Sequence, residues 1–468
     1  MTTTDKHSKG FAPRILIVGG GFAGLECAHR LERRLAAREA DITLVSDQNH
    51  QLYLPLLPHV ASGRLTPQSV AVPLRRMLRR TTLVPGRAIG VDTKAKAVVV
   101  RDSEGELQVR AYDYLVLAPG SVTRQFDIPG VAEHALGMKT LAEAAYVRDH
   151  VIAQLDLAAA TDDPAEREAR LQFVVVGGGY AGTETAAHLR RLTASAAKRY
   201  PHLDPAQIRW HLVDTAAKLM PELGDGLGRK AVRILERRGV EVSLGVSVAS
   251  AGRDVVRLTD GRVLPCRTLI WTAGVAPSPL ISTLDAATDR GRLVTEADMT
   301  VPGLDGVFAL GDAAAVPDLA TGGDQVCAPT AQHAQRQGKA AAMNVLAAIR
   351  GFDATEYRHR DLGLVVDLGG LQAVAKPLGV PLSGLPAQAA TSGYHLMAMR
   401  TLTARCRVGA GWLLHALAGD DFVRIGFQSH RPATLADFED TDGYLTSGQI
   451  HDLTRTVRPP QAAAGSVA

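Results

Sequence analysis

The feature that most constrains the fold of this 468-residue chain is an aliphatic run followed by a glycine-rich turn and a helical pattern. ILIV at residues 15–18 is typical of a buried strand, and GGGFAG follows directly at residues 19–24. In such a turn Gly19 permits the tight bend, Gly21 lets the main chain approach a pyrophosphate, and Gly24 lets the helix pack against the strand. The helix amino terminus adds about half a positive charge. The stretch therefore predicts a Rossmann-type dinucleotide-binding unit.

The same pattern occurs a second time. FVVV at residues 173–176 runs into GGGYAG at residues 177–182, which places Gly177, Gly179 and Gly182 at the equivalent positions. Two complete strand–glycine–helix units are far more specific than one bare motif, and they indicate two separate dinucleotides. The predicted fold class is α/β, with two Rossmann-like domains and a carboxy-terminal α+β region.

Polar residues at the ends of the next strands are candidates for contacts with ribose hydroxyls. The strand after the first unit's helix ends in Ser46-Asp47, and the sequence does not decide which of the two makes the contact. The corresponding strand of the second unit ends at Asp214, with no arginine immediately after it. A carboxylate there accepts hydrogen bonds from the adenosine hydroxyls and repels a 2′-phosphate, which favours NADH over NADPH.

Several further turns lie at strand ends or helix starts. Asp312 follows Gly311 after an apolar strand; it either binds flavin ribityl hydroxyls or caps the next helix. The loop around Pro55 either lies along a flat ring system or fills the core.

Bulk properties exclude several classes of protein. A formal charge of +4 is too small to indicate nucleic-acid binding. The four cysteines lie far apart, which argues against a disulfide scaffold or a zinc site. The isolated histidines His59, His188 and His333 do not have metal-ligand spacing, so no metal is expected. The sequence shows neither a membrane span nor a secretory h-region, and a cytoplasmic location, free or on the inner face of the membrane, is expected.

Together these motifs resemble the flavoprotein reductases that bind two dinucleotides, and among them the type II NADH dehydrogenases. These are non-proton-pumping NADH:quinone oxidoreductases that hold FAD. The resemblance extends over nearly the whole chain, through ITLVSDQNHQLYLPLLP, MKTLAEAAYVRDHVI, LIWTAGV, VFALGD, APTAQHAQRQG and GYHLMAMRT.

The resemblance implies non-covalent FAD on the first unit, NADH on the second, and a quinone, menaquinone or ubiquinone, as acceptor. The implied FAD-site residues are Gly19, Gly21, Gly24, Ser46, Asp47, Pro55, Ala118, Gly120, Gly311, Asp312 and Ala331. The implied NADH-site residues are Gly177, Gly179, Gly182, Asp214 and Gly274. Ser46 stands where many family members carry an acid.

The resemblance also implies the catalytic residues. Glu184, in the first turn of the second unit's helix, corresponds to a family glutamate near nicotinamide and flavin; the alternative role is a carboxylate favoured by the helix dipole. Gln332 and Gln337 match the family's quinone-site helix, but Arg336 departs from it. Gln332 and Arg336 are four residues apart and are expected to share one helix face, beside the acceptor.

An apolar stripe near the carboxy terminus predicts an amphipathic helix. It consists of Leu396, Met399, Leu402, Cys406, Ala410, Leu413 and Leu417. The adjacent arginines suit a membrane surface, and docking on the protein body or on a second copy in a homodimer is the alternative. Gly409 and Gly411 are expected to interrupt the helix.

The expected division of the chain is an FAD domain (residues 14–145 and 286–350), an NADH domain (146–285) and a carboxy-terminal interface region (351–456). Residues 1–13 and 457–468 are expected to be disordered tails. The alternative activity is a soluble NAD(P)H-dependent flavin oxidoreductase or diaphorase with a non-quinone acceptor, and a non-catalytic NADH-responsive flavoprotein is a further alternative. A disulfide reductase is disfavoured, because His50 to Tyr53 occupy the loop where a cysteine pair would lie.

Overall fold

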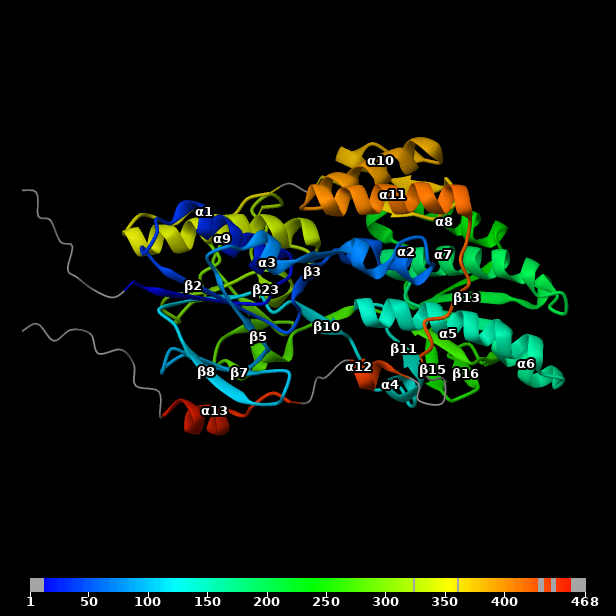
Figure 1. Ribbon diagram of the computed structural model, residues 1–468, viewed down its shortest axis with the longest axis horizontal. Coiled ribbons are helices and arrows are strands. Elements are labelled where there is room, and N and C mark those ends of the chain that lie inside the picture. The colour runs from blue at the N-terminus through cyan, green and yellow to red at the C-terminus, as the bar shows by residue number, and fades with distance from the viewer. Residues whose placement is uncertain (1–11, 323–324, 360–361, 428–432, 439–442, 456–468) are drawn as a thin grey trace, which may run out of the picture.

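The computed structural model describes residues 12–322, 325–359, 362–427, 433–438 and 443–455. Two α/β units lie side by side (Figure 1). The carboxy-terminal helices α10 (Leu385–Ala398) and α11 (Leu402–Ala418) lie along one side of the second unit. The predicted tails lie almost entirely outside the described residues, so the expectation of disorder there stays a prediction.

The first unit is built on a five-stranded parallel sheet with the order β22-β9-β1-β2-β5. Its strands are β1 (Arg14–Val18), β2 (Asp41–Ser46), β5 (Thr82–Pro85), β9 (Tyr114–Leu117) and β22 (Val307–Ala309). The last of these comes from far along the chain, so the chain passes through the second unit before it returns to complete this sheet.

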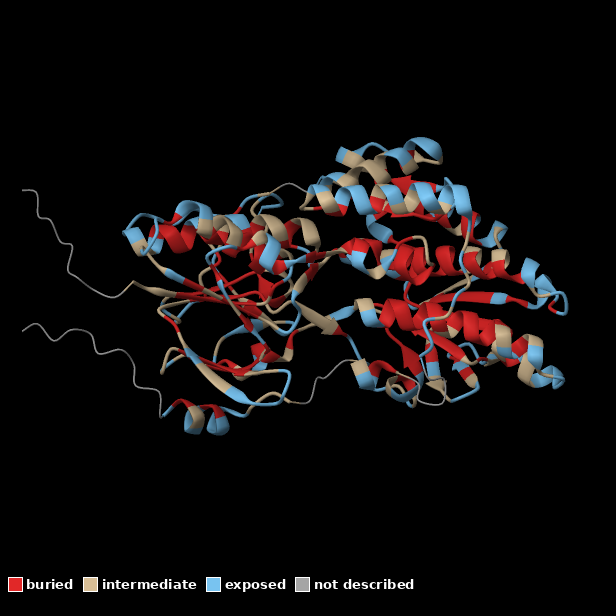
Figure 2. Cartoon of the chain, viewed as in Figure 1, coloured by how far each residue is buried: buried red, intermediate tan, exposed pale blue. Residues whose placement is uncertain are grey.

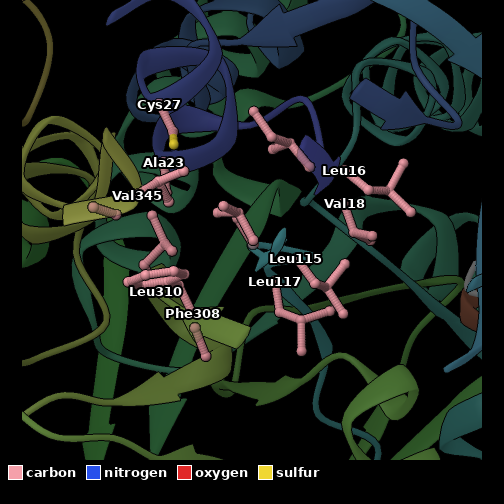
Figure 3. Packing of buried hydrophobic residues seen from close by; sticks show 14 of the residues in the cluster. Leu16, Val18, Ala23, Cys27, Leu115, Leu117, Phe308, Leu310 and Val345 are labelled. Carbon is pink, nitrogen blue, oxygen red and sulfur yellow. The ribbon is translucent and has the colours of Figure 1, made fainter. Parts of the chain in front are cut away.

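Two helices cover one face of this sheet. They are α1 (Phe22–Arg34) and α9 (Ala331–Arg350), and they cross closely because Gly338 has no side chain. A Cβ atom at Gly338 would overlap the carbonyl oxygen of Ala23. Side chains of β1, β9, β22 and both helices form one buried cluster, which includes Leu16, Val18, Phe308 and Val345 (Figure 3).

The second unit repeats this arrangement with the order β11-β18-β12-β13-β14. Its strands are β11 (Ala135–Leu136), β12 (Gln172–Val176), β13 (Arg209–Asp214), β14 (Val240–Leu244) and β18 (Thr268–Trp271). The accompanying helices are α5 (Leu141–Ala160), α6 (Pro164–Leu171), α7 (Tyr180–Ala196) and α8 (Asp225–Arg237). All its strands pair in parallel, as expected for strands joined by helical crossovers.

An antiparallel pair connects the two units. β10 (Ser121–Thr123) leaves the first unit and β19 (Val275–Pro277) returns to it, and the two strands pair with each other. Two three-stranded antiparallel sheets flank the units. They are formed by β6 (Arg87–Asp92), β7 (Ala97–Arg101) and β8 (Leu107–Ala111), and by β15 (Val248–Ala251), β16 (Val255–Leu258) and β17 (Val263–Pro265).

The carboxy-terminal region is the predicted α+β region. It contains β24 (Val365–Asp367), β25 (Ala373–Ala375), β26 (Leu382–Ser383), α10 (Leu385–Ala398) and α11 (Leu402–Ala418). The remaining short elements are β3 (His50–Leu52), α2 (Leu57–Ala61), β4 (Ala71–Pro73), α3 (Leu74–Met77), α4 (Val131–His134), β20 (Thr288–Asp289), β21 (Arg292–Val294), β23 (Ala314–Ala315), α12 (Leu435–Phe438) and α13 (Ser447–Thr454).

The structure corrects the prediction of one carboxy-terminal amphipathic helix. The chain leaves the helical conformation at Met399, which is buried, and Thr401 caps a new helix by accepting a hydrogen bond from the Ala404 N–H at 3.2 Å. The two glycines do not interrupt α11. A Cβ atom at Gly411 would lie 2.8 Å from Leu65 Cδ2, so a larger residue there would displace the Leu65 side chain.

The outer face of α10 and α11 is exposed (Figure 2), and large apolar side chains lie on it. Among its leucines, Leu402, Leu413 and Leu417 are 75%, 62% and 79% exposed. Within the described part of the chain, every helix is too short or too polar to span a bilayer.

Candidate functional site

The first glycine turn connects β1 to α1. Gly19 has a φ of +102°, and a Cβ atom there would overlap the carbonyl oxygen of Ala118. A Cβ on Gly24 would overlap the carbonyl oxygen of Gly19, whereas one on Gly21 would meet no atom of the described chain within 4 Å. Gly19 and Gly24 are thus needed by the fold itself, and the space beside Gly21 is open to a bound group.

The second glycine turn has the same division of roles. Gly177 has a φ of +111° and lies against Thr272, and a Cβ on Gly182 would overlap the carbonyl oxygen of Gly177. A Cβ on Gly179 would meet no atom of the described chain within 4 Å. Both turns therefore combine a fixed backbone with an open position above the helix amino terminus, which is the shape a pyrophosphate requires.

Ser46 and Asp47 behave differently at the end of β2. Ser46 Oγ lies against the first glycine turn, beside Gly20, and its hydroxyl donates to the carbonyl oxygen of Gln48 at 2.8 Å. Asp47 is paired with Arg87 at 3.3 Å in an exposed position. Of the two candidates, Ser46 is therefore the residue beside the turn.

Asp214 is held beside the second glycine turn. Its Oδ2 accepts a hydrogen bond from the Gly178 N–H, and its Oδ1 accepts one from the Ala216 N–H at 2.6 Å. These bonds fix the carboxylate next to the glycine loop, where the adenosine ribose of a dinucleotide is held in a Rossmann unit.

Asp312 lies in the turn after β22. Ser121 Oγ donates to Asp312 Oδ2 at 2.6 Å and accepts a hydrogen bond from Lys139 Nζ at 2.8 Å. The Gly311 N–H donates to Gln337 Oε1 at 2.8 Å, and Gln337 is buried. Gln337 therefore ties α9 to the Gly311–Asp312 turn, a role that the sequence pattern did not indicate.

The other predicted FAD and NADH residues lie at the carboxyl ends of the strands or at helix starts. Ala118 and Gly120 follow β9, Gly274 follows β18, Pro55 lies in a 3-10 turn, and Ala331 is the first residue of α9. Gly120 and Gly274 have φ values of +76° and +93°, and a Cβ on either would meet no atom of the described chain within 4 Å.

Glu184 lies in the first turns of α7 and is buried. Its Oε1 accepts a hydrogen bond from the main-chain N–H of Asp367 at 2.7 Å. Burial, together with the negative charge of Asp367, raises the pKa of Glu184 well above its ordinary value. The hydrogen bond from the Asp367 N–H acts in the opposite direction, because it favours the ionised carboxylate.

Gln332 and Arg336 have different surroundings on α9. The Gln332 amide donates to the carbonyl oxygen of Gly363 at 2.9 Å. Arg336 donates to the main-chain oxygen of Gln332 at 3.1 Å and lines an open cavity of about 510 Å³. The other cationic residues lining this cavity are Arg30, Arg34, Lys339 and Arg358. Arg336 is thus not paired with Glu184.

Sequence reasoning missed one group of buried residues. His59, His188 and Asp367 come from three distant segments. One ring nitrogen of each histidine and one carboxylate oxygen of Asp367 nevertheless lie within 4.8 Å of one another. They lie next to Glu184 through Asp367. No local spacing could have indicated this group, because only the tertiary fold brings α2, α7 and β24 together.

The residues present fit both dinucleotides. The open positions at Gly21 and Gly179, the fixed carboxylate of Asp214 and the Ser121–Asp312 pair together provide two phosphate turns and two sets of hydroxyl-binding groups. The arrangement suits hydride and electron transfer between two bound dinucleotides.

Comparison with known proteins agrees with this geometry. Residues 13–338 match the family model of pyridine nucleotide-disulphide oxidoreductases. A type II NADH:quinone oxidoreductase of Mycobacterium tuberculosis, NdhA, is 34% identical over 68% of this chain and 70% of that protein. A second one from the same organism, Ndh, is 32% identical over 79% of this chain and 81% of that protein.

A solved structure shows the same fold. NDH2 from Plasmodium falciparum, in complex with NADH, superposes with a TM-score of 0.82 over 88% of this chain and 99% of that chain, at 18% identity. With the two glycine turns and the sequence relatives, the fold gives the assignment: the chain belongs to the type II NADH:quinone oxidoreductases, within the pyridine nucleotide-disulphide oxidoreductase family.

Proposed function

We propose that this protein oxidises NADH with a quinone, using non-covalently bound FAD and without pumping protons. The observation that carries the proposal is the pair of glycine turns, each with an open second glycine and a hydroxyl-binding group beside it. FAD, when bound, supplies the chemistry of accepting a hydride from NADH and passing two electrons to a quinone.

The first unit is assigned to FAD. Gly19, Gly21 and Gly24 would hold the pyrophosphate, Ser46 would contact the adenosine ribose, and Asp312 would contact the ribityl chain. The hydrogen bond from Ser121 to Asp312 supports this role, since it fixes the carboxylate at the strand end. The amino terminus of α9, beginning at Ala331, would stabilise negative charge facing it by about 1 kcal/mol.

The second unit is assigned to NADH. Gly177, Gly179 and Gly182 would hold its pyrophosphate, and Asp214 would accept hydrogen bonds from the ribose hydroxyls. Glu184 is fixed by the Asp367 N–H, and its protonated form would donate a hydrogen bond or a proton beside the nicotinamide.

The domain boundaries follow from these assignments. Residues 14–145 and 286–350 form the FAD domain, residues 146–285 the NADH domain, and residues 351–456 the interface region. The return of β22 and α9 to the first sheet and helix layer supports the discontinuous first domain.

Gln332, Arg336 and Gln337 are assigned to the acceptor side of α9, with menaquinone or ubiquinone as the acceptor. The exposed apolar face of α10 and α11 would rest on the cytoplasmic surface of the membrane, where a long-tailed quinone is dissolved. A homodimer formed through this face is the competing arrangement.

A diaphorase with a soluble acceptor is the second candidate, and the position of Arg336 favours it. The guanidinium lies in an open, cation-lined cavity rather than in an enclosed apolar pocket for a quinone ring. Steady-state NADH oxidation with short- and long-tailed quinones and with soluble dyes separates the two activities. Higher kcat/KM with every soluble dye than with any quinone would contradict the quinone assignment.

The variant Arg336→Gln restores the family residue. It is expected to leave flavin reduction by NADH unchanged and to alter flavin reoxidation by quinone, because α9 is assigned to the acceptor side. Stopped-flow absorbance at the flavin band measures both half-reactions. If Arg336→Gln changes neither half-reaction, Arg336 belongs to the outer cavity and not to the acceptor site. If the variant slows only the reduction of flavin by NADH, Arg336 belongs to the nicotinamide side.

A further inference from the structure

A buried polar cluster lies where the second unit meets the carboxy-terminal region. At its centre is Asp367, the last residue of β24, which is 2% exposed. His59 Nε2 lies 3.1 Å and Arg64 Nη1 3.3 Å from Asp367 Oδ2, and His188 Nε2 lies 3.7 Å from Oδ1. Two segments, residues 59–64 and α7, therefore direct three nitrogen atoms at one carboxylate.

The outer partners of the two histidines determine their tautomers. Trp412 Nε1, which can only donate, lies 3.0 Å from His59 Nδ1, so Nδ1 accepts and Nε2 carries the proton. Arg64, also only a donor, lies 3.4 Å from His188 Nδ1 and has the same effect there. Both Nε2–H groups face Asp367, His59 within hydrogen-bond distance and His188 at 3.7 Å, so these two nitrogens present N–H groups and not the lone pairs that a metal ion needs.

Asp367 is fixed on its main-chain side as well. The Gly369 N–H donates to Asp367 Oδ1 at 2.6 Å, and the Gln388 amide donates to Oδ2 at 3.2 Å. Its own main-chain N–H donates to Glu184 Oε1 at 2.7 Å. The residue that the cluster immobilises is thus the residue that holds Glu184.

We propose that Asp367 is a positioning residue for Glu184: its clamped carboxylate holds the end of β24 so that its N–H fixes Glu184 and its negative charge lies next to Glu184. The role rests on the proposed function, in which Glu184 acts beside the nicotinamide. Arg64 is the cation that balances this charge, and Trp412 links the cluster to α11.

The electrostatics of the cluster agree with this assignment. Burial opposes ionisation of Asp367, but the facing groups of His188, His59 and Arg64 outweigh it and hold its pKa well below the usual value. Burial lowers the pKa of both histidines below its ordinary value, while the facing Asp367 carboxylate opposes that shift. The other ionisable groups around the cluster are Tyr53, Arg191, Arg238, His395, His415 and Asp420.

The test uses the FAD-loaded protein and four variants: Asp367→Asn, Arg64→Gln, Glu184→Gln and the Asp367→Asn/Glu184→Gln double variant. The rate constant of flavin reduction by NADH is measured by stopped-flow from pH 5.5 to 9, together with the thermal midpoint of each protein. Asp149→Asn is the matched control, since Asp149 is a buried aspartate that accepts main-chain N–H bonds from Ile425 and Phe427.

Asp367→Asn is expected to move the pH midpoint of the rate constant down by about one unit, because it removes a negative charge near Glu184. Arg64→Gln is expected to move the midpoint up, because it leaves that charge unbalanced. Glu184→Gln should abolish the titration, and adding Asp367→Asn to it should cause no further change in rate. Asp149→Asn should lower the thermal midpoint without moving the pH midpoint.

Opposite shifts cannot arise from a general loss of stability. The inference is overturned if Asp367→Asn and Arg64→Gln shift the pH midpoint in the same direction, or if neither shifts it. It is also overturned if the rate constant of the double variant falls by the product of the losses in Asp367→Asn and Glu184→Gln. If Asp367→Asn does not fold, the upward shift in Arg64→Gln alone decides, and its absence overturns the inference.

A readout without NADH separates this inference from the proposed function. The infrared band of the protonated Glu184 carboxyl, identified by its loss in Glu184→Gln, is titrated in each variant. The same opposite shifts are expected there. If NADH does not reduce the flavin of the wild-type protein, the proposed function is contradicted. The infrared titration would still support or overturn the role of Asp367.

Discussion

At the residue scale, Asp214 is expected to set the choice of nicotinamide cofactor. Two main-chain N–H groups hold its carboxylate beside the glycine turn, so it cannot turn away from a 2′-phosphate without losing them. Asp214→Ser should reduce the preference for NADH over NADPH at least tenfold, since about 1.4 kcal/mol of repulsion corresponds to a factor of ten. The ratio of kcat/KM values measures this. A wild type that already prefers NADPH would place the ribose elsewhere.

Glu184 is expected to make stability depend on pH. Its folded-state pKa lies above its unfolded value, so its contribution to stability is complete below about pH 4.5 and is lost as pH rises toward the folded pKa. Glu184→Gln keeps the acceptor for the Asp367 N–H but does not ionise. The difference in thermal midpoint, variant minus wild type, should therefore grow between pH 5 and pH 8. The exposed Glu104→Gln serves as control, and parallel curves for all three proteins would show that Glu184 is not buried as a neutral acid.

At the element scale, the exposed face of α11 gives a prediction about membrane binding. Leu413 and Leu417 are 62% and 79% exposed, so replacing both with serine should leave the fold intact. Burial of a leucine in an apolar phase is worth about 1.5–3 kcal/mol, so the double variant should bind vesicles of anionic phospholipid at least tenfold more weakly. Flotation with vesicles measures this, with the distant exposed Leu107→Ser as control. Unchanged flotation combined with loss of a dimer in sedimentation would assign the face to self-association.

The same helix shows how far the sequence could be interpreted. Local patterns predicted the strand–glycine–helix units, because the strand, the turn and the helix start are adjacent in the chain. The periodicity from Leu396 to Leu417 predicted one helix. The helix is instead interrupted between Ala398 and Leu402, where Arg400 pairs with Glu26 of α1. The cluster of His59, His188 and Asp367 was not predictable either, since it depends on the packing of three segments that are remote in sequence.

At the scale of the whole molecule, the two units are expected to bind their dinucleotides independently. Gly21 and Gly179 each have open space around an added Cβ, and both have negative φ values near −74°, so alanine is compatible with the fold at either position. A methyl group there would occupy the approach of the pyrophosphate. Gly24→Ala, by contrast, would overlap the carbonyl oxygen of Gly19 and should destabilise the protein itself.

The expected results distinguish the two sites. Gly21→Ala should fold but lose most of its FAD, measured as yellow chromophore released into the supernatant on denaturation. Gly179→Ala should keep its FAD and lose the increase in thermal midpoint that NADH causes in the wild type, because a ligand stabilises only the state that binds it. If Gly179→Ala lost the flavin and Gly21→Ala kept it, the assignment of the two units would be reversed, and β22 with Asp312 would belong to the NADH site.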